Sequence, residues 1–131
     1  MNGDLSGLSV LIVDDEEDFA HTLSSRLQLR GMSVNVACSG DEGMRFLAHT
    51  LPDVLLLDMR MPGLSGTDVL KKLRQEKTVP GGETLPVIIV SGHSSVQDYH
   101  VAQDLGIQGY VAKPLQFDEL LAAIASATGR A

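Results

Sequence analysis

The chain has 131 residues, of which 44% are apolar and 21% charged, a composition typical of one globular domain with its own core. Its formal net charge of −7, with no run of Lys or Arg, argues against a direct nucleic-acid surface, because phosphate backbones are bound by basic patches. The apolar stretches fall far short of the ~20 residues that cross a membrane, and the N-terminus lacks the basic and apolar regions of a secretory signal. With a single cysteine, Cys38, no internal disulfide can form, and a cytoplasmic location is expected.

The N-terminal part of the sequence predicts two strands and two helices. Residues 1–7 are polar and contain glycine, which is typical of a frayed lead-in. A β-branched apolar run over 8–13 indicates the first strand, and alternation over 33–37 indicates the second. Apolar residues at helical spacing predict one helix over about 17–30 and a shorter one over 41–49.

The middle of the chain predicts a strand, a helix and a long loop. Residues 54–57 are four apolar residues that lead directly into Asp58, a pattern typical of a strand buried on both faces. A helix is predicted over about 66–76, with Ser65 as its N-cap. Residues 77–86 contain two prolines and a Gly-Gly pair, so they predict a loop longer than most connections in α/β proteins.

The C-terminal part repeats the alternation of strands and helices. Residues 87–90 and 107–112 indicate the fourth and fifth strands. The segment 94–105 predicts a helix with a weak apolar stripe, and we expect it to be the most mobile helix. A clear apolar stripe predicts the final helix over about 117–127.

Five strands alternating with five helices predict an α/β fold of the flavodoxin-like, doubly wound (βα)5 type. Its core is one five-stranded parallel sheet with helices on both faces. The expected strand order is 2-1-3-4-5. No repeat or second domain is apparent, so residues 1–131 are expected to form a single domain. Its core would lie at about 8–127, with short flexible segments at 1–7 and 128–131.

Polar side chains follow four of the five predicted strands. Asp14 and Asp15 follow the first strand, Asp58 the third, Ser91 the fourth and Lys113 the fifth. In a doubly wound sheet the functional cleft lies at the carboxyl ends of the strands, where the strand order reverses. Strands one and three flank this reversal in the order 2-1-3-4-5. Three carboxylates are therefore expected in one pocket.

The carboxylates indicate a magnesium site. Close carboxylates stay ionised together only beside a cation, and an all-oxygen, partly open site suits Mg²⁺. Asp14 and Asp15 are the expected protein ligands from the first strand. Asp58 would contribute another carboxylate oxygen, and Arg60 its backbone carbonyl.

Asp58 is then the candidate nucleophile toward phosphorus, because carboxylates can form aspartyl phosphates. The Lys113 ammonium would neutralise charge that builds on the transferred phosphoryl oxygens. Ser91 would donate a hydrogen bond to one of these oxygens. Each of the three side chains would have its own catalytic task.

The chain resembles the receiver domains of two-component response regulators. The matching segments lie at strand ends and span essentially the whole chain: VDDEE at 13–17, LLLDMRMPGLSG at 55–66, IIVSGH at 88–93 and GYVAKPL at 109–115. The chemotaxis member of this family has the 2-1-3-4-5 sheet. The resemblance implies that Asp58 is phosphorylated, with Mg²⁺, by a sensor histidine kinase, a phosphotransfer protein or a small phosphodonor.

The resemblance also implies how phosphorylation is transmitted. The Tyr110 ring is expected to swing inward as the loop after Ser91 closes, which would remodel the face made by the fourth helix, fifth strand and fifth helix. This face would contact an output domain or target protein, and it is a candidate surface for a homodimer. The peptide bond between Lys113 and Pro114 is expected to be cis. The chain is expected to be a switch with self-phosphorylation and autodephosphorylation chemistry, not a turnover enzyme.

Some particulars differ from the commonest family pattern. The switch hydroxyl belongs to Ser91 where threonine is commoner, and the loop at 77–86 is longer than usual. Arg60 and His93 occupy variable positions beside the pocket and are expected to tune the phosphate lifetime. Arg60 would either shield the acyl phosphate or contact a partner, and the sequence leaves both open.

Two other interpretations share some of these features. An aspartate-nucleophile phosphohydrolase also uses Mg²⁺ and an Asp at a strand end, but it usually needs a second acid two residues later, where this chain has Arg60. A phosphate-independent adaptor would lack pocket residues, and none is missing. The sequence does not distinguish a complete single-domain regulator from a receiver cut from a longer chain.

Overall fold

The computed structural model describes residues 4–92 and 95–130. One sheet of five parallel strands forms its centre, in the order β2-β1-β3-β4-β5. The strands are β1 (Ser9–Val13), β2 (Ser33–Ala37), β3 (Val54–Leu57), β4 (Val87–Ser91) and β5 (Gly109–Ala112). The predicted α/β fold and its strand order are confirmed.

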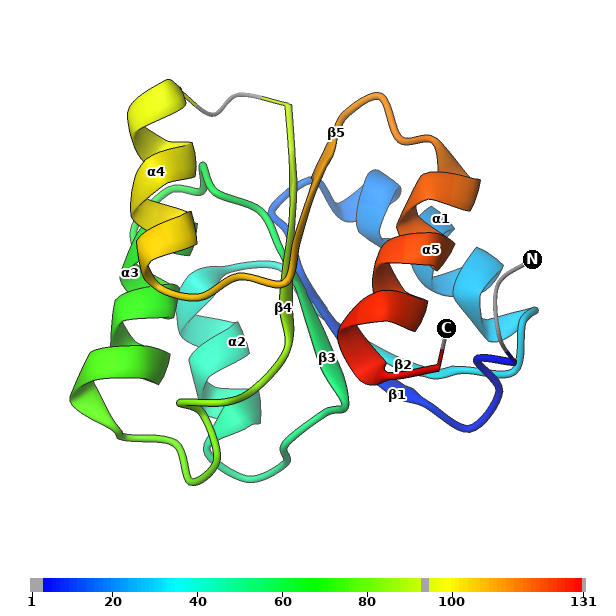
Figure 1. Cartoon of the computed structure of the whole chain (residues 1–131), viewed down its shortest axis with the longest axis horizontal. Helices are drawn as coiled ribbons and strands as arrows, with labels where there is room; N and C mark the ends of the chain where they lie inside the picture. Colours follow the sequence, from blue (N-terminus) through cyan, green and yellow to red (C-terminus); the bar gives the residue numbers. More distant parts are fainter. Residues whose placement is uncertain (1–3, 93–94, 131) are drawn as a thin grey trace.

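Helices cover both faces of the sheet. They are α1 (Glu17–Gln28), α2 (Gly40–Leu47), α3 (Gly66–Lys71), α4 (Val96–Asp104) and α5 (Phe117–Thr128). A π-helical turn, η1 (Lys72–Glu76), continues α3, so the single helix predicted over 66–76 changes its winding partway. Helices α1 and α5 lie on one face, and α2, α3 and α4 on the other (Figure 1). In the described part of the chain, no helix has the length and apolarity to cross a membrane.

Each face of the sheet carries its own apolar cluster. Val10 and Ile12 of β1 pack with the apolar residues of α1 and α5. Leu11 and Val13, the alternate residues of the same strand, pack with those of α2, α3 and α4. All four residues of β3 are buried. Burial on both faces explains why the strand segments are continuous apolar runs.

Two helices on the same face begin with the same capping box. The Ser65 hydroxyl accepts a hydrogen bond from the amide of Asp68, and the Asp68 carboxylate accepts one from the amide of Ser65. Ser95 and Asp98 form the equivalent pair at the start of α4. The predicted N-cap at Ser65 is confirmed. Among the residues of α4, only Ala102 is buried, which agrees with the weak apolar stripe of the sequence.

The described residues near the two ends of the chain pack against the domain. Leu5 is buried and belongs to the cluster beneath α1 and α5. The amide of Gly7 donates to the carbonyl of Gly31 at 2.9 Å, and an Arg130 amino group donates to the carbonyl of Asp4 at 3.2 Å. Residues 4–7, which the sequence assigns to a frayed lead-in, therefore pack against the domain, and Leu5 is buried there.

The loop predicted over 77–86 is irregular but held in place by an arginine of η1. The half-buried Arg74 guanidinium donates four hydrogen bonds, to the backbone carbonyls of Gly82 at 2.6 Å, Leu105 at 2.8 Å, Leu85 at 2.9 Å and Gly106 at 3.1 Å. Two of these carbonyls belong to the loop, and two follow the end of α4. Arg74 therefore ties the long loop to the connection between α4 and β5.

Candidate functional site

The register of the sheet brings Asp14 and Asp58 together. Val13 of β1 is paired with Leu57 of β3, so the next residue of each strand leaves the sheet at the same edge. The amide of Asp58 donates to the carbonyl of Val13 at 3.0 Å, which fixes the end of β3 against β1. The side chains of both aspartates are almost fully buried, 2% exposed for Asp14 and 6% for Asp58.

Asp15 completes a group of three carboxylates with these two residues. One carboxylate oxygen from each of Asp14, Asp15 and Asp58 lies within 4.8 Å of the other two, and Asp15 is the exposed member. The donors are all oxygen, and the exposed Asp15 leaves one side open to solvent. These properties fit Mg²⁺. The structure thus brings the three carboxylates among the predicted metal ligands into one pocket, and the fourth predicted ligand, the backbone carbonyl of Arg60, stays a prediction.

The pocket raises the pKa of its buried carboxylates. Burial raises the pKa of Asp58 from 3.8 to about 6, the charge of Asp14 adds to the rise, and Lys113 opposes it. Burial also raises the pKa of Asp14, against the hydrogen bond from the backbone amide of Glu16 at 2.9 Å and against Lys113. A buried carboxylate with a raised pKa at a strand end is typical of functional sites.

Lys113 supplies the positive charge of the pocket from the end of β5. Its Nζ atom donates to Oδ2 of Asp14 at 2.9 Å and to Oε1 of Glu16 at 2.6 Å, and it lies 4.3 Å from the centre of the Phe19 ring. Burial by itself would lower the pKa of Lys113, but the hydrogen bonds to Glu16 and Asp14 raise it overall. The ammonium therefore stays charged. The peptide bond between Lys113 and Pro114 is cis, as the resemblance implied.

Ser91 ends β4 on the same edge of the sheet. It is 3% exposed, and a hydrogen bond from its side chain lowers the pKa of Asp58 against the stronger effect of burial. Its carbonyl accepts a hydrogen bond from the amide of Lys113 at 3.1 Å, which ties the ends of β4 and β5 together. Ser91 thus lies where a hydroxyl could reach an oxygen of a group on Asp58.

Tyr110 is half-buried and lies beside a cleft. Its ring packs edge-to-face on that of Tyr99, with 5.1 Å between the ring centres. A cleft of about 350 Å³ is lined by both tyrosines and by Ser91, Val96 and Lys113, among others. The predicted switch residues, Ser91 and Tyr110, therefore border one space.

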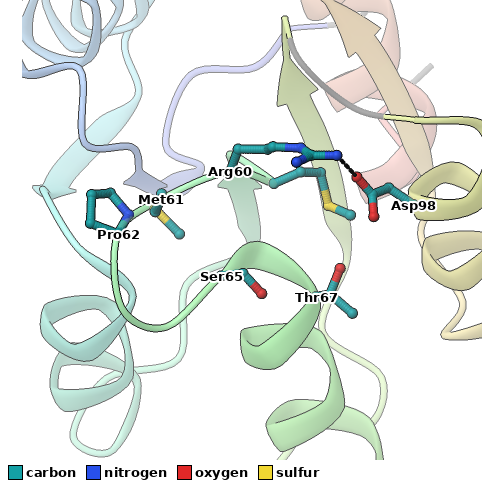
Figure 2. A pocket seen from close by; sticks show the side chains of 7 residues that line it. Arg60, Met61, Pro62, Ser65, Thr67 and Asp98 are labelled. Carbon is teal, nitrogen blue, oxygen red and sulfur yellow. Dashed lines mark hydrogen bonds and ion pairs between the residues drawn. The ribbon is translucent and has the colours of Figure 1, made fainter.

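Arg60 extends away from the loop after β3. Its side chain is 59% exposed, and one amino nitrogen lies 3.0 Å from Oδ2 of Asp98 at the start of α4 (Figure 2). It borders a cleft of about 370 Å³ between this loop and the starts of α3 and α4. His93, the other predicted tuning residue, lies outside the described residues.

Two partners of the site were missed by the sequence reasoning. Glu16 accepts a hydrogen bond from Lys113, although in the sequence it appears only within the matching segment VDDEE and was given no role of its own. Asp98 binds Arg60 across 38 residues of sequence, a pairing that needs the tertiary arrangement. The only sequence signal at Asp98 was the Ser-x-x-Asp capping pattern, which does not reveal a distant cation.

A doubly wound sheet with an aspartate pocket and a strand-end lysine defines a receiver domain, the phosphoacceptor module of two-component systems. Residues 10–125 match the response regulator receiver domain family, so the chain belongs to this family. Phosphorylation by a kinase is the general function of such domains.

Named relatives agree with this assignment. The transcriptional regulatory protein KdpE of Mycobacterium tuberculosis is 39% identical over 121 residues, which cover 92% of this chain and 51% of KdpE. The sensory transduction protein RegX3 of Mycolicibacterium smegmatis is 40% identical over 116 residues, which cover 88% of this chain and 48% of RegX3. The chain thus spans about half the length of the curated relatives it matches.

Solved structures share the fold over nearly their whole length. The receiver domain of the Francisella response regulator 1452 superposes with a TM-score of 0.83 at 28% identity, covering 95% of this chain and 98% of that one. A response regulator receiver domain protein from Clostridium thermocellum gives a TM-score of 0.82 at 30% identity, covering 94% and 95%.

Proposed function

We propose that the chain is a Mg²⁺-dependent phosphoacceptor switch of the cytoplasm and that Asp58 receives the phosphoryl group. The observation that carries this proposal is the meeting of one buried carboxylate, two further aspartates and one ammonium at the point where the strand order reverses. The donor would be a sensor histidine kinase, a phosphotransfer protein or a small phosphodonor.

The chain's own residues divide the chemistry between them. An ionised oxygen of Asp58 attacks phosphorus, so that a P–O bond forms as the bond to the donor breaks and its electron pair leaves with the donor. The Lys113 ammonium offsets charge on the transferred oxygens, and the Ser91 hydroxyl donates to one of them. The aspartyl phosphate that forms carries two negative charges on its phosphoryl oxygens, so a pocket without positive charge would repel it.

Asp14 and Asp15 would hold the metal ion together with Asp58, and the backbone carbonyl of Arg60 would supply a further oxygen. The bound Mg²⁺ would neutralise phosphoryl charge and orient the group for in-line transfer. Asp14 already has a cation partner in Lys113. When the metal and the phosphoryl group bind, Asp14 would gain the metal as a partner and Lys113 would gain the phosphoryl oxygens.

The output would be a changed protein surface. Closure of the loop after Ser91 would draw the Tyr110 ring inward, into the cleft that both residues border, and alter the face formed by α4, β5 and α5. That face would contact an output domain or a target protein, or a second copy of the chain. KdpE and DltR, both about twice as long as the matched region, are named as transcriptional regulatory proteins. The chain would act through such a partner rather than on DNA itself, because its net charge is −7.

The proposal is tested by incubating the protein with Mg²⁺ and acetyl phosphate and measuring the intact mass. We expect a single phosphoryl adduct in the wild type and none in Asp58→Asn. The adduct should disappear with time as the chain hydrolyses it. An equal adduct on Asp58→Asn would refute the assignment of the acceptor. Sustained turnover of phosphomonoesters would refute the switch and favour a phosphohydrolase.

A further inference from the structure

The ion pair between Arg60 and Asp98 joins the two segments that a receiver switch must couple. Arg60 lies two residues after Asp58, and Asp98 lies in the first turn of α4. The same oxygen, Oδ2 of Asp98, accepts from the Arg60 guanidinium at 3.0 Å and from the amide of Ser95 at 3.3 Å. One carboxylate oxygen therefore accepts from both the helix cap and the arginine of the loop after Asp58. Figure 2 shows the contact with the arginine.

Helix α4 depends on such tethers because it buries little apolar surface. Of its nine residues only Ala102 is buried, and Val96 is 74% exposed. At its C-terminal end, the half-buried Arg74 binds the carbonyls of Leu105 and Gly106. At its N-terminal end, the exposed Arg60 makes one hydrogen bond to Asp98 within the described residues. The C-terminal tether is thus strong and the N-terminal tether weak.

The contact between Arg60 and Asp98 is suited to replacement by a phosphoryl group. Only one guanidinium nitrogen and one carboxylate oxygen take part, whereas Arg prefers paired hydrogen bonds to phosphate. A phosphoryl group on Asp58 would place more negative charge two residues from Arg60 than Asp98 offers. The residue after Asp98, Tyr99, packs on Tyr110, so movement of this turn would also reach the aromatic of the proposed switch.

We propose that Asp98 is a positioning residue: in the resting protein it holds Arg60 away from the pocket, and phosphorylation of Asp58 draws Arg60 off Asp98 and frees the first turn of α4. This inference rests on the proposed function, since it needs a phosphoryl group at Asp58. The helix itself persists, because the capping box of Ser95 and Asp98 does not require the arginine. Arg74 keeps the far end of α4 in place, so the helix pivots about that end.

The capping boxes of α3 and α4 provide matched variants. Asp98→Asn keeps an oxygen that can accept from Ser95 but loses the charge that binds Arg60. Asp68→Asn makes the same change at the start of α3, where the box has the same geometry and lies outside the proposed tether. Arg60→Gln removes the cation and retains the backbone carbonyl. A merely capping role would make the two aspartate variants behave alike.

The first measurement is amide hydrogen exchange of the unliganded protein. We expect exchange in the first turn of α4 to become about two- to fivefold faster in Arg60→Gln and in Asp98→Asn, the range typical of exposed ion pairs. In Asp68→Asn the first turn of α3, which this residue caps, should exchange at the wild-type rate. Equal α4 exchange in the wild type, Arg60→Gln and Asp98→Asn would overturn the restraint, as would an equally large effect of Asp68→Asn on the first turn of α3.

The second measurement is the affinity for beryllofluoride with Mg²⁺, a stand-in for the phosphoryl group on Asp58. Asp98→Asn should bind it about two- to fivefold more tightly than the wild type, because Arg60 no longer has a competing anion. In the Arg60→Gln background the same substitution should change nothing, because Asp98 acts through Arg60. An unchanged affinity in Asp98→Asn, or a gain that persists without Arg60, would overturn the proposal.

The two measurements separate this proposal from the proposed function. If the wild type fails to bind beryllofluoride and Mg²⁺, the phosphoacceptor function is refuted and the release with it. The exchange experiment needs no ligand and still decides whether Asp98 restrains α4 in the resting protein. If binding is normal but the exchange pattern is absent, only the Arg60–Asp98 restraint is refuted.

Discussion

The Nζ atom of Lys113 lies 2.9 Å from Oδ2 of Asp14, although 99 residues separate the two in the sequence. The lysine is held beside the three aspartates, where it compensates the buried carboxylate of Asp14. Glu16 holds the same Nζ atom at 2.6 Å from the exposed side. Lys113 therefore has two competing tasks: it neutralises part of the charge of the aspartate pocket, and it is the proposed cation for the phosphoryl group.

These two tasks predict opposite effects of Lys113→Met. Mg²⁺ binding should become about three- to tenfold tighter, because a neighbouring positive charge no longer repels the ion. The rate of phosphorylation by acetyl phosphate should fall about a hundredfold, because a charge that stabilises the transferred oxygens is lost. Titration calorimetry and the rate of adduct formation measure the two effects. Lys72→Met, which removes a lysine paired only with Glu76 on the surface, is the control. Equal loss of both properties would show that the variant is misfolded.

The raised pKa of Asp58 predicts a pH dependence of stability in metal-free protein. Burial places this pKa at about 6 in the folded state, against 3.8 for an ordinary aspartate, so the folded state binds the proton more tightly. The free energy of unfolding should therefore fall as pH rises through this window, by roughly 1–2 kcal/mol after allowance for solvent screening.

Asp58→Asn lacks this titration and tests its sign. In chelator, the variant should be more stable than the wild type at pH 7, and the difference should shrink as pH falls from about 7 to 4. Urea unfolding at several pH values measures it. Added Mg²⁺ should stabilise the wild type at pH 7 by binding the ionised carboxylates. Parallel pH profiles of the two proteins without metal would contradict the assigned pKa.

The fold could be predicted because its signals are local. Apolar runs such as Val54–Leu57 mark strands buried on both faces, and Ser65 marks a helix start by hydrogen bonds within three residues. The packing of Leu5 could not be predicted, because the short polar stretch around it shows no periodicity. The π-helical turn Lys72–Glu76 was missed for another reason: its winding accompanies the tertiary contacts of Arg74, which local propensity does not describe.

The site residues that the sequence predicted differ in the same way from those that it did not predict. Asp14, Asp58 and Lys113 directly follow strands and Ser91 ends one, so a parallel sheet of known order places them at one edge whatever the loops do. Glu16 and Asp98 act through the tips of flexible side chains, and their partners lie just after β5 and in the loop after β3. Which cation each carboxylate meets depends on side-chain direction, and the sequence carries no periodic signal for that.

Gly66 is predicted to be essential to the position of Asp58. A Cβ at this residue would clash with the carbonyl oxygen of Asp58 and lie 2.7 Å from Cα of Met59, and backbone atoms cannot yield without moving the acceptor. Gly66→Ala should cost about 3 kcal/mol of unfolding free energy and weaken Mg²⁺ binding. Urea unfolding and metal titration measure these effects.

Gly63 in the same loop is the matched control for Gly66. Its φ is +75°, but a Cβ there would meet no atom within 4 Å. Gly63→Ala should therefore cost only about 1 kcal/mol, the strain of a left-handed backbone, and leave Mg²⁺ binding nearly unchanged. If the two alanine variants lost equal stability and affinity, backbone strain alone would explain both, and the close approach of Gly66 to Asp58 would not matter.

Arg74 is predicted to be the main polar anchor of the long loop and of the C-terminal end of α4. Arg74→Met keeps the apolar stem but leaves four backbone carbonyls without their guanidinium partner. The expected loss is about 2–4 kcal/mol in the free energy of unfolding, because hydrogen bonds from a charged donor are lost and water cannot fully replace them around the half-buried guanidinium. Arg45→Met, at an exposed position of α2, should stay within about 0.5 kcal/mol of the wild type.

Hydrogen exchange should rise in residues 77–86 and at the end of α4 in Arg74→Met, while β1 and β3 stay protected. A loss of stability as small as that of Arg45→Met would show that water replaces the guanidinium at these carbonyls.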